Sequence, residues 1–98
     1  MSAIRGLVGL EGMIESRPDY REGRPHIAGT GVSVGRIGVL YGQGLSAEQI
    51  AREYRLELDQ VHAALAYYLR NRTAIDADLE KQEADALRLA EHWKSRNR

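Results

Sequence analysis

Apolar residues recur at helical spacing through the middle of the chain, from residue 45 to residue 72. Ser46 followed by Gln49 is the pattern of a capping box, which predicts a helix beginning just after Ser46. A turn at residues 55–57 leads to a second, longer helix that begins at Leu58. The apolar face of the first helix would be Ala47, Ile50, Ala51 and Tyr54, and that of the second Leu58, Val61, Leu65, Tyr68 and Leu69. The pattern therefore predicts two helices joined by a tight turn.

The preceding residues predict short extended segments and one more helix. Residues 1–12 carry three glycines among Leu and Val, which predicts a flexible arm. Residues 13–16 and 24–28 are expected to form the two strands of a β-hairpin, with a loop at residues 21–23. Pro25 cannot stand inside a helix, so residues 24–28 are expected to be extended. Ser33 is placed to cap a helix that ends at the glycines near residue 43. This helix would present Val34, Ile37, Leu40 and Tyr41 on one side.

A final helix is expected from Ala74 to about Lys94, with Thr73 as its cap. Its apolar stripe is interrupted, because charged residues separate Ile75 and Leu79 from a second group. That second group is Ala86, Leu87, Leu89, Ala90 and Trp93. A two-part stripe predicts that the first half packs on the domain and the second half contacts another molecule. We therefore expect one domain at residues 13–79 and a partner-binding helix at residues 80–98.

The composition of the chain argues against several classes of function. A chain of 98 residues has length for one domain, and its 14 basic and 14 acidic residues give no overall positive field, so DNA contact would need a local patch. Cysteine is absent, which excludes disulfides and thiolate metal sites, and no apolar run is long enough to span a membrane. The histidines lack metal-ligand spacing, and no nucleophile or general acid accompanies the acidic pairs. We expect a cytoplasmic, non-enzymatic domain without metal or cofactor.

Four segments in order resemble the family known as domain of unknown function 433: GRPHIAGT at 23–30, VSV at 32–34, GLSAEQI at 44–50 and QVHAALAYY at 60–68. The resemblance covers roughly residues 20–79. It implies a mainly α fold, with a short N-terminal β-hairpin followed by a homeodomain-like helix-turn-helix bundle and a long C-terminal helix. It also implies an antitoxin of a type II toxin–antitoxin system whose usual partner is a PIN-like ribonuclease. Two positions depart from the family pattern: Gly31 replaces an Arg, and Glu57 replaces a Thr or Ser cap.

The resemblance places two candidate surfaces on the chain. DNA would contact the helix-turn-helix, where Glu57 and Asp59 oppose phosphate but other residues suit backbone or base edges. These DNA-binding candidates are Arg36, Arg52, Arg55, Gln60 and His62. The toxin would contact the C-terminal helix, with Trp93 as anchor and a terminal arginine entering the acidic site of the nuclease. The toxin-binding candidates are Leu87, Leu89, Ala90, Trp93, Arg96 and Arg98.

Three functions are consistent with the sequence. The first is an antitoxin that neutralises a PIN-like ribonuclease and regulates its own operator, working as a homodimer. The second is a stand-alone helix-turn-helix regulator that binds DNA without a toxin. The third is a structural dimerisation module that uses the hairpin and the C-terminal helix.

Overall fold

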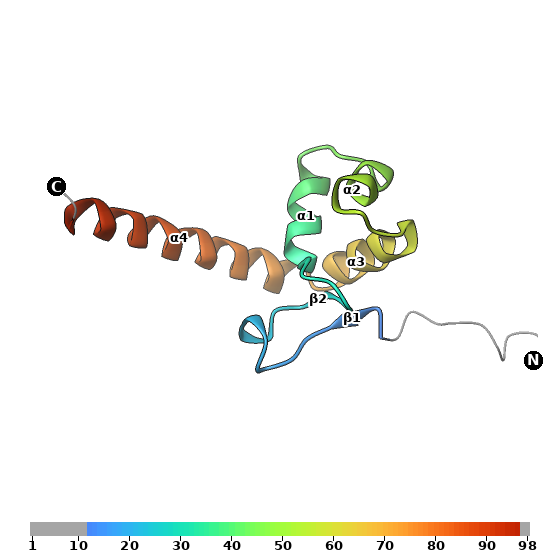
Figure 1. Cartoon of the computed structure of the whole chain (residues 1–98), viewed down its shortest axis with the longest axis horizontal. Coiled ribbons are helices and arrows are strands. Elements are labelled where there is room, and N and C mark those ends of the chain that lie inside the picture. Colours follow the sequence, from blue (N-terminus) through green and yellow to red (C-terminus); the bar gives the residue numbers. More distant parts are fainter. Residues whose placement is uncertain (1–11, 97–98) are drawn as a thin grey trace, which may run out of the picture.

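Helices dominate residues 12–96, the part of the chain that this computed structural model describes (Figure 1). The elements in chain order are β1 (Ile14–Glu15), the short 3-10 helix η2 (Arg21–Gly23), β2 (His26–Ile27), α1 (Val34–Gly42), α2 (Ala47–Tyr54), α3 (Leu58–Arg70) and α4 (Arg72–Arg96). β1 and β2 pair antiparallel, with Ile14 opposite Ile27 and Glu15 opposite His26. The mainly α fold with an N-terminal hairpin and a long last helix is confirmed. The arm expected at residues 1–12 lies outside the described residues, except for Gly12.

Two helix starts follow the sequence signals. Ser33 Oγ accepts a hydrogen bond from Arg36 N at 3.0 Å, which caps α1. Ser46 and Gln49 form the expected capping box: Gln49 N donates to Ser46 Oγ at 3.1 Å, and Ser46 N donates to Gln49 Oε1 at 2.7 Å. Such caps satisfy backbone N–H groups that have no partner within the helix. These two predicted starts are confirmed.

The predicted cap of the last helix is wrong. α4 begins at Arg72, so Thr73 lies inside the helix. Asn71 occupies the junction between α3 and α4: its N–H donates to Tyr67 O at 3.1 Å, and its carbonyl accepts from Ile75 N at 3.0 Å. Because one residue both ends α3 and starts α4, the chain needs no separate cap.

The core lies where β2, α1, α2 and α3 meet. Its fully buried large side chains are Ile27, Val34, Ile37, Ile50 and Val61. Three apolar residues that the helical spacing placed on core faces are instead exposed: Tyr41, Leu58 and Leu69. Each stands in the first or last turn of its helix, where the helix extends past the core. Periodicity defines a face but does not show how far along the helix that face is covered.

Two glycines let α1 approach its neighbours closely. A Cβ on Gly38 would lie 2.7 Å from ring atoms of Tyr68, and one on Gly35 would lie 3.0 Å from Leu79 Cδ2. Both distances are shorter than van der Waals contact, so a larger residue at either position would require Tyr68, Leu79 or α1 itself to shift. The glycines therefore help to place the base of α4.

α4 runs out of the domain (Figure 1). The chain measures 67 × 30 × 24 Å along its principal axes, and α4 supplies much of the longest dimension. Burial along α4 stops at Gln82, and residues 83–96 are all exposed. Within residues 12–96, no helix combines the length and apolar character needed to cross a membrane.

Candidate protein-interaction site

An ion pair between distant parts of the chain fixes the base of α4. Arg24, which follows η2, places its Nε 2.8 Å from Asp78 Oδ2 and its Nη2 3.4 Å from Asp78 Oδ1. Gln82 Nε2 donates to the same Asp78 Oδ2 at 2.9 Å, and Glu22 lies 3.5 Å from Arg24 Nη2. The hydrogen bond with Arg24 lowers the pKa of Asp78, and the same bond raises the pKa of Arg24. Asp78 is therefore held as a carboxylate that ties the hairpin to α4.

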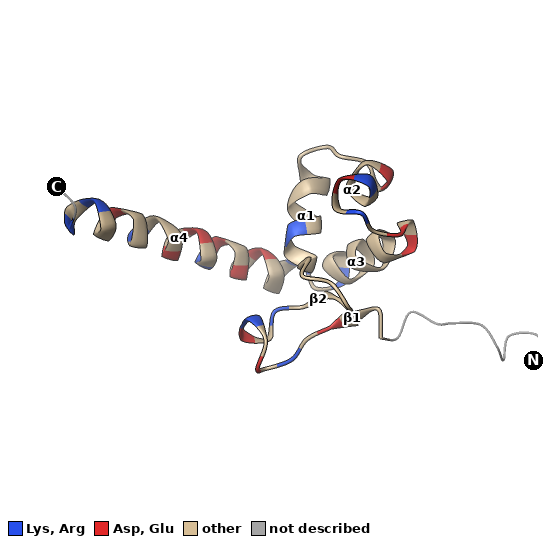
Figure 2. Ribbon diagram, in the orientation of Figure 1, with Lys and Arg blue, Asp and Glu red and all other residues tan. Residues whose placement is uncertain are grey.

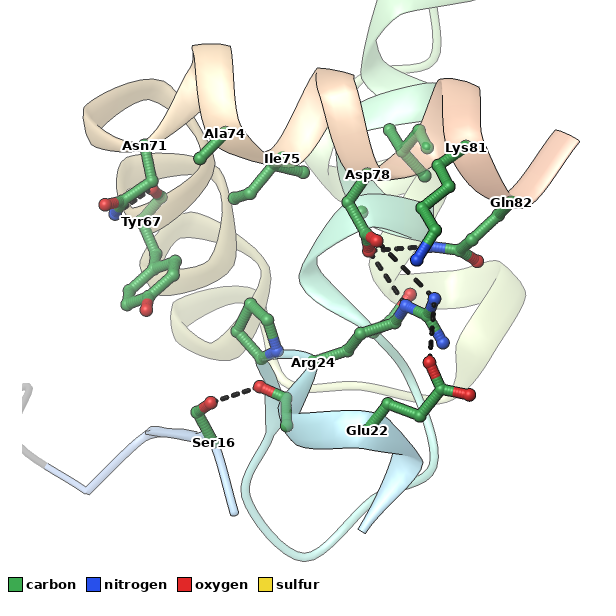
Figure 3. A pocket seen from close by; sticks show the side chains of 15 residues that line it. Ser16, Glu22, Arg24, Tyr67, Asn71, Ala74, Ile75, Asp78, Lys81 and Gln82 are labelled. Atoms are coloured by element: carbon green, nitrogen blue, oxygen red, sulfur yellow. Dashed lines mark hydrogen bonds and ion pairs between the residues drawn. The ribbon is translucent and has the colours of Figure 1, made fainter. Parts of the chain in front are cut away.

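A groove of about 470 Å³ opens beside this ion pair (Figure 3). It lies between the hairpin loop, the start of α1, the end of α3 and the base of α4. Arg24, Glu22, Asp78, Lys81 and Gln82 supply charged and polar groups, so positive and negative groups both border it. Its apolar lining includes Pro25, Tyr67, Ala74, Ile75 and Leu79. The groove is thus half polar and open at the point where α4 leaves the domain.

A second set of contacts holds the first turns of α4. Ile75 is 9% exposed and packs in the core cluster, with Leu79 partly buried against that cluster. Tyr68 OH donates to Asp76 Oδ1 at 2.7 Å, and Arg72 Nε lies 3.6 Å from Asp76 Oδ2. The hydrogen bond to Asp76 raises the pKa of Tyr68. Together with Arg24 and Asp78, these contacts fix the direction in which α4 leaves the domain.

The distal half of α4, residues 83–96, carries large apolar side chains in solvent. Leu87 is 61% exposed, Leu89 70% and Trp93 67%. Ala90 and Arg96 are also exposed, whereas Arg98 lies outside the described residues. Large apolar side chains exposed along one segment are typical of surfaces that contact another molecule.

The apolar residues of the distal half do not form one strip. Successive residues of an α-helix are rotated by about 100°, so Leu87 and Leu89 project from nearly opposite sides. Leu89 and Trp93 share a side with Ala86, and this side continues the stripe of Ile75 and Leu79. The sequence-predicted toxin-binding set therefore divides into a side with Leu89 and Trp93 and a side with Leu87, with Ala90 between them.

The comparisons with known proteins agree with this fold. Residues 14–68 match the family model described as "Protein of unknown function (DUF433)". The chain belongs to the DUF433 family. The crystal structure of a DUF433 member protein from Anabaena variabilis ATCC 29413 is similar to this chain, with 24% sequence identity and a TM-score of 0.65. That similarity covers 81% of this chain and 79% of the Anabaena chain, and it supports the fold alone. No curated protein matches the sequence.

The DUF433 match ends inside α3, at residue 68, so α4 lies beyond it. The groove is consequently formed at the border between the matched region and α4, from residues of both. The exposed apolar side chains of residues 83–96 likewise lie in the part of the chain that the family model leaves unmatched.

The sequence-predicted DNA-binding residues occupy several elements of the DUF433 domain. Arg36 on α1, Arg52 on α2 and Arg55 at the end of α2 are exposed, and none forms an ion pair with another described residue. His62 is also exposed on α3. Gln60 is engaged locally, because its Oε1 accepts from Glu57 N at 2.7 Å and so helps to start α3. Glu57 thus begins α3 without the Thr or Ser of the family pattern.

The hairpin of this DUF433 protein holds a polar cluster that sequence reasoning missed. His26 is 2% exposed, with Nε2 3.2 Å from Glu15 Oε2 and Nδ1 3.4 Å from Arg24 O. Tyr20 lies against His26 with ring centroids 4.8 Å apart, and the guanidinium groups of Arg17 and Arg21 lie over the Tyr20 ring. These contacts join β1 to the loop that carries Arg24. Within residues 12–96, no group of three His, Cys, Asp or Glu side chains is arranged to hold a metal ion.

Proposed function

We propose that this DUF433 protein is the antitoxin of a type II toxin–antitoxin system and neutralises a PIN-like ribonuclease through the distal half of α4. The exposure of Leu87, Leu89 and Trp93 on a helix that projects from a folded domain supports this proposal. A helix with exposed apolar residues suits docking into a groove of a partner protein. Its place of action is the cytoplasm, where such a ribonuclease meets its RNA substrates.

The chemistry of the helix fits inhibition of a nuclease. Trp93 is the residue type that most often anchors a protein interface, because it buries a large rigid surface. Beyond Trp93 the chain carries Lys94, Arg96 and Arg98. A guanidinium group pairs with carboxylates through two parallel hydrogen bonds, so an arginine at this end can occupy the cation position of an acidic, metal-dependent nuclease. Inhibition then requires no catalytic group on this chain.

The proposal is tested by truncation and by substitution. A chain ending at Glu83 keeps every residue that lines the groove, so it should unfold at nearly the temperature of the full chain yet lose ribonuclease binding in calorimetry. Within the full chain, Trp93→Ala should weaken binding at least about 30-fold, as expected for an aromatic anchor. Arg88→Ala, a change at another exposed position of the same helix, is the matched control. Undiminished inhibition of the ribonuclease by the truncated chain would contradict the proposal.

Binding to operator DNA is a second candidate function. The chain would bind DNA either in addition to the ribonuclease or as a regulator that has no toxin partner. The observation that favours it is the exposure of Arg52 and Arg55, three residues apart at the end of α2 and not paired with any described acidic residue. Replacing both with Ala should weaken binding to DNA from upstream of the gene and lower the slope of log K against log salt by about 2. Absence of DNA binding by the wild-type chain at low salt would exclude this function.

A further inference from the structure

One side of α4 forms a continuous seam from the domain to the end of the described helix. The seam consists of positions spaced alternately by four and three residues: Ile75, Leu79, Gln82, Ala86, Leu89 and Trp93. Such spacing keeps side chains on one side of a helix and is the spacing by which two helices pack together. The domain covers the first three positions, since Ile75 is buried and Leu79 and Gln82 are half-buried. The last three positions, on residues 83–96, are exposed.

Charge along α4 changes sign from base to tip. Figure 2 shows acidic residues gathered toward the base and basic residues at the tip. Residues 72–85 of α4 carry Asp76, Asp78, Glu80, Glu83 and Asp85 with Arg72 and Lys81, and residues 86–96 carry Arg88, Lys94 and Arg96 with Glu91. Two such helices side by side in parallel would place like charges together, whereas an antiparallel pair would place the acidic base of each beside the basic tip of the other. The charges therefore favour an antiparallel second copy.

The flanks of the seam agree with this arrangement. Glu83 and Lys94 lie along one flank, and Asp85 and Arg96 lie along the other, by rotation of about 100° per residue. In an antiparallel helix pair, equivalent flanks face each other. Glu83 of one copy then meets Lys94 of the second copy, and Asp85 meets Arg96. Asp85 already pairs with Arg88 of its own helix, which leaves its second oxygen for the other copy.

The alignment of the two helices that pairs these charges also leaves space for Trp93, the largest side chain. It places Ala86 of one copy opposite Trp93 of the second copy, so a small residue leaves room for each indole. It also brings the tip of each helix toward the other copy's groove, whose lining includes the acidic Glu22 and Asp78 and the basic Arg24 and Lys81. The segment that pairs is about 21 Å long at 1.5 Å per residue. The domains stand at opposite ends of the pair and do not compete for space.

We propose that two copies of this chain pair antiparallel through residues 83–96 of α4, burying Ala86, Leu89 and Trp93 between them and placing the basic tip of each helix beside the acidic base of the other. The pair has twofold symmetry, as most small homodimers do. It buries less surface than a standard interface of about 1,600 Å², as is typical of weak, reversible association. Trp93 also serves the proposed ribonuclease contact, so self-pairing and ribonuclease binding compete.

Leu89 and Leu87 lie on opposite sides of the distal half of α4, so their variants can be compared for their effect on self-association. Sedimentation of the full chain should show a monomer–dimer equilibrium. Leu89→Asp should weaken it at least tenfold, and Leu87→Asp, on the opposite side, should leave it within threefold. Both positions are exposed, so thermal unfolding should change little and will confirm that each variant is folded. A wild-type chain that remains monomeric at 100 µM, or equal effects of the two variants, would overturn the proposal.

Charge exchange tests which residues meet. Glu83→Lys with Asp85→Lys, and separately Lys94→Glu with Arg96→Glu, should each weaken self-association at least tenfold. An equimolar mixture of these two variants should recover wild-type affinity, because both ends of the mixed dimer are then complementary. A mixture that stays monomeric would overturn the proposed contacts.

Direction is measured with a spin label on Ser95→Cys, the protein's only cysteine once introduced. In the antiparallel pair, position 95 of one copy and position 95 of the other are separated along the helix axis by the length of about eleven residues. At 1.5 Å per residue, the two labels then lie more than about 15 Å apart. A shorter distance would show a parallel pair and contradict the proposal. None of these measurements involves the ribonuclease, so loss of ribonuclease binding in a chain that still dimerises would contradict the proposed function alone.

Discussion

The two halves of α4 are one helix with one seam, but only the first half has side chains that are buried or half-buried against the domain. Residues up to Gln82 pack on α1 and α3 or pair with Arg24, whereas residues 83–96 contact solvent. The difference does not lie in residue type, because leucines stand on the seam in both halves. It lies in distance from the domain, which covers the seam only as far as its own surface extends.

The first half also explains why the second can be helical. An isolated helix of fewer than about 12–15 residues is marginal in water because its first turn costs more than each added residue gains. Here the Tyr68–Asp76 and Arg24–Asp78 contacts fix the first turns, so the distal half only has to continue an existing helix. A segment ordered in this way presents its side chains to a partner at little further conformational cost.

The difference between the two halves of α4 is tested most directly by truncating one seam side chain in each half and measuring the free energy of unfolding. Ile75→Ala should lower the free energy of unfolding by about 2–4 kcal/mol, because it leaves a cavity at a site that is 9% exposed. Leu89→Ala, at an exposed site, should change the same free energy by less than about 0.5 kcal/mol. Urea unfolding of the two variants, at concentrations where the chain is monomeric, measures both values. Similar losses would mean that the distal half contributes to the fold after all.

A smaller effect is expected from widening the space between α1 and α3. Gly38→Ala should destabilise the chain by about 1–3 kcal/mol, since the new methyl group meets the Tyr68 ring and displaces the residue that binds Asp76. Gly42→Ala is the matched control on the same helix, where a Cβ would meet no atom within 4 Å. The control should be neutral or stabilising by up to about 1 kcal/mol, from helix propensity. A stabilised Gly38→Ala variant would show that Tyr68 moves at no cost.

The local features of this fold were predictable from sequence. Ser33 and Ser46 begin helices because their side chains accept hydrogen bonds from residues three positions away, and such signals are complete within four residues. Pro25 and the glycine at position 23 likewise indicate the hairpin by local geometry. The interrupted apolar stripe of residues 75–93 predicted that the first half of the last helix packs on the domain, as Ile75 and Leu79 do.

Features that depend on distant residues were not predictable. Arg24 and Asp78 are 54 residues apart, and neither carries a local sign of the other. Tyr41, Leu58 and Leu69 match their apolar stripes, yet only the positions of neighbouring helices decide that they are exposed. The opposite orientation of Leu87 and Leu89 could have been found from helical rotation alone, because two residues of separation turn the helix by about 200°. Counting apolar residues without their rotation merged two sides into one.

The smallest effect concerns the ion pair at the base of α4. The hydrogen bond from Arg24 lowers the pKa of Asp78 in the folded chain, so ionised Asp78 stabilises the fold above the unfolded-state pKa of about 3.9. That contribution is lost as the pH falls through the lowered pKa of the folded state. Asp78 is partly exposed, so its contribution at neutral pH should not exceed about 1 kcal/mol. Asp78→Asn should therefore be less stable than the wild type at pH 6, and the difference should be smaller at the lowest pH at which the chain stays folded.

The matched change in the distal half is Asp85→Asn, which removes the exposed pair with Arg88. It should alter the free energy of unfolding by less than about 0.5 kcal/mol at either pH, because an exposed pair within one helix is screened by water and gains little from being held. Urea titrations at both pH values measure the two differences. If Asp85→Asn cost as much as Asp78→Asn and showed the same pH dependence, the ion pair with Arg24 would have no special part in holding α4 to the domain.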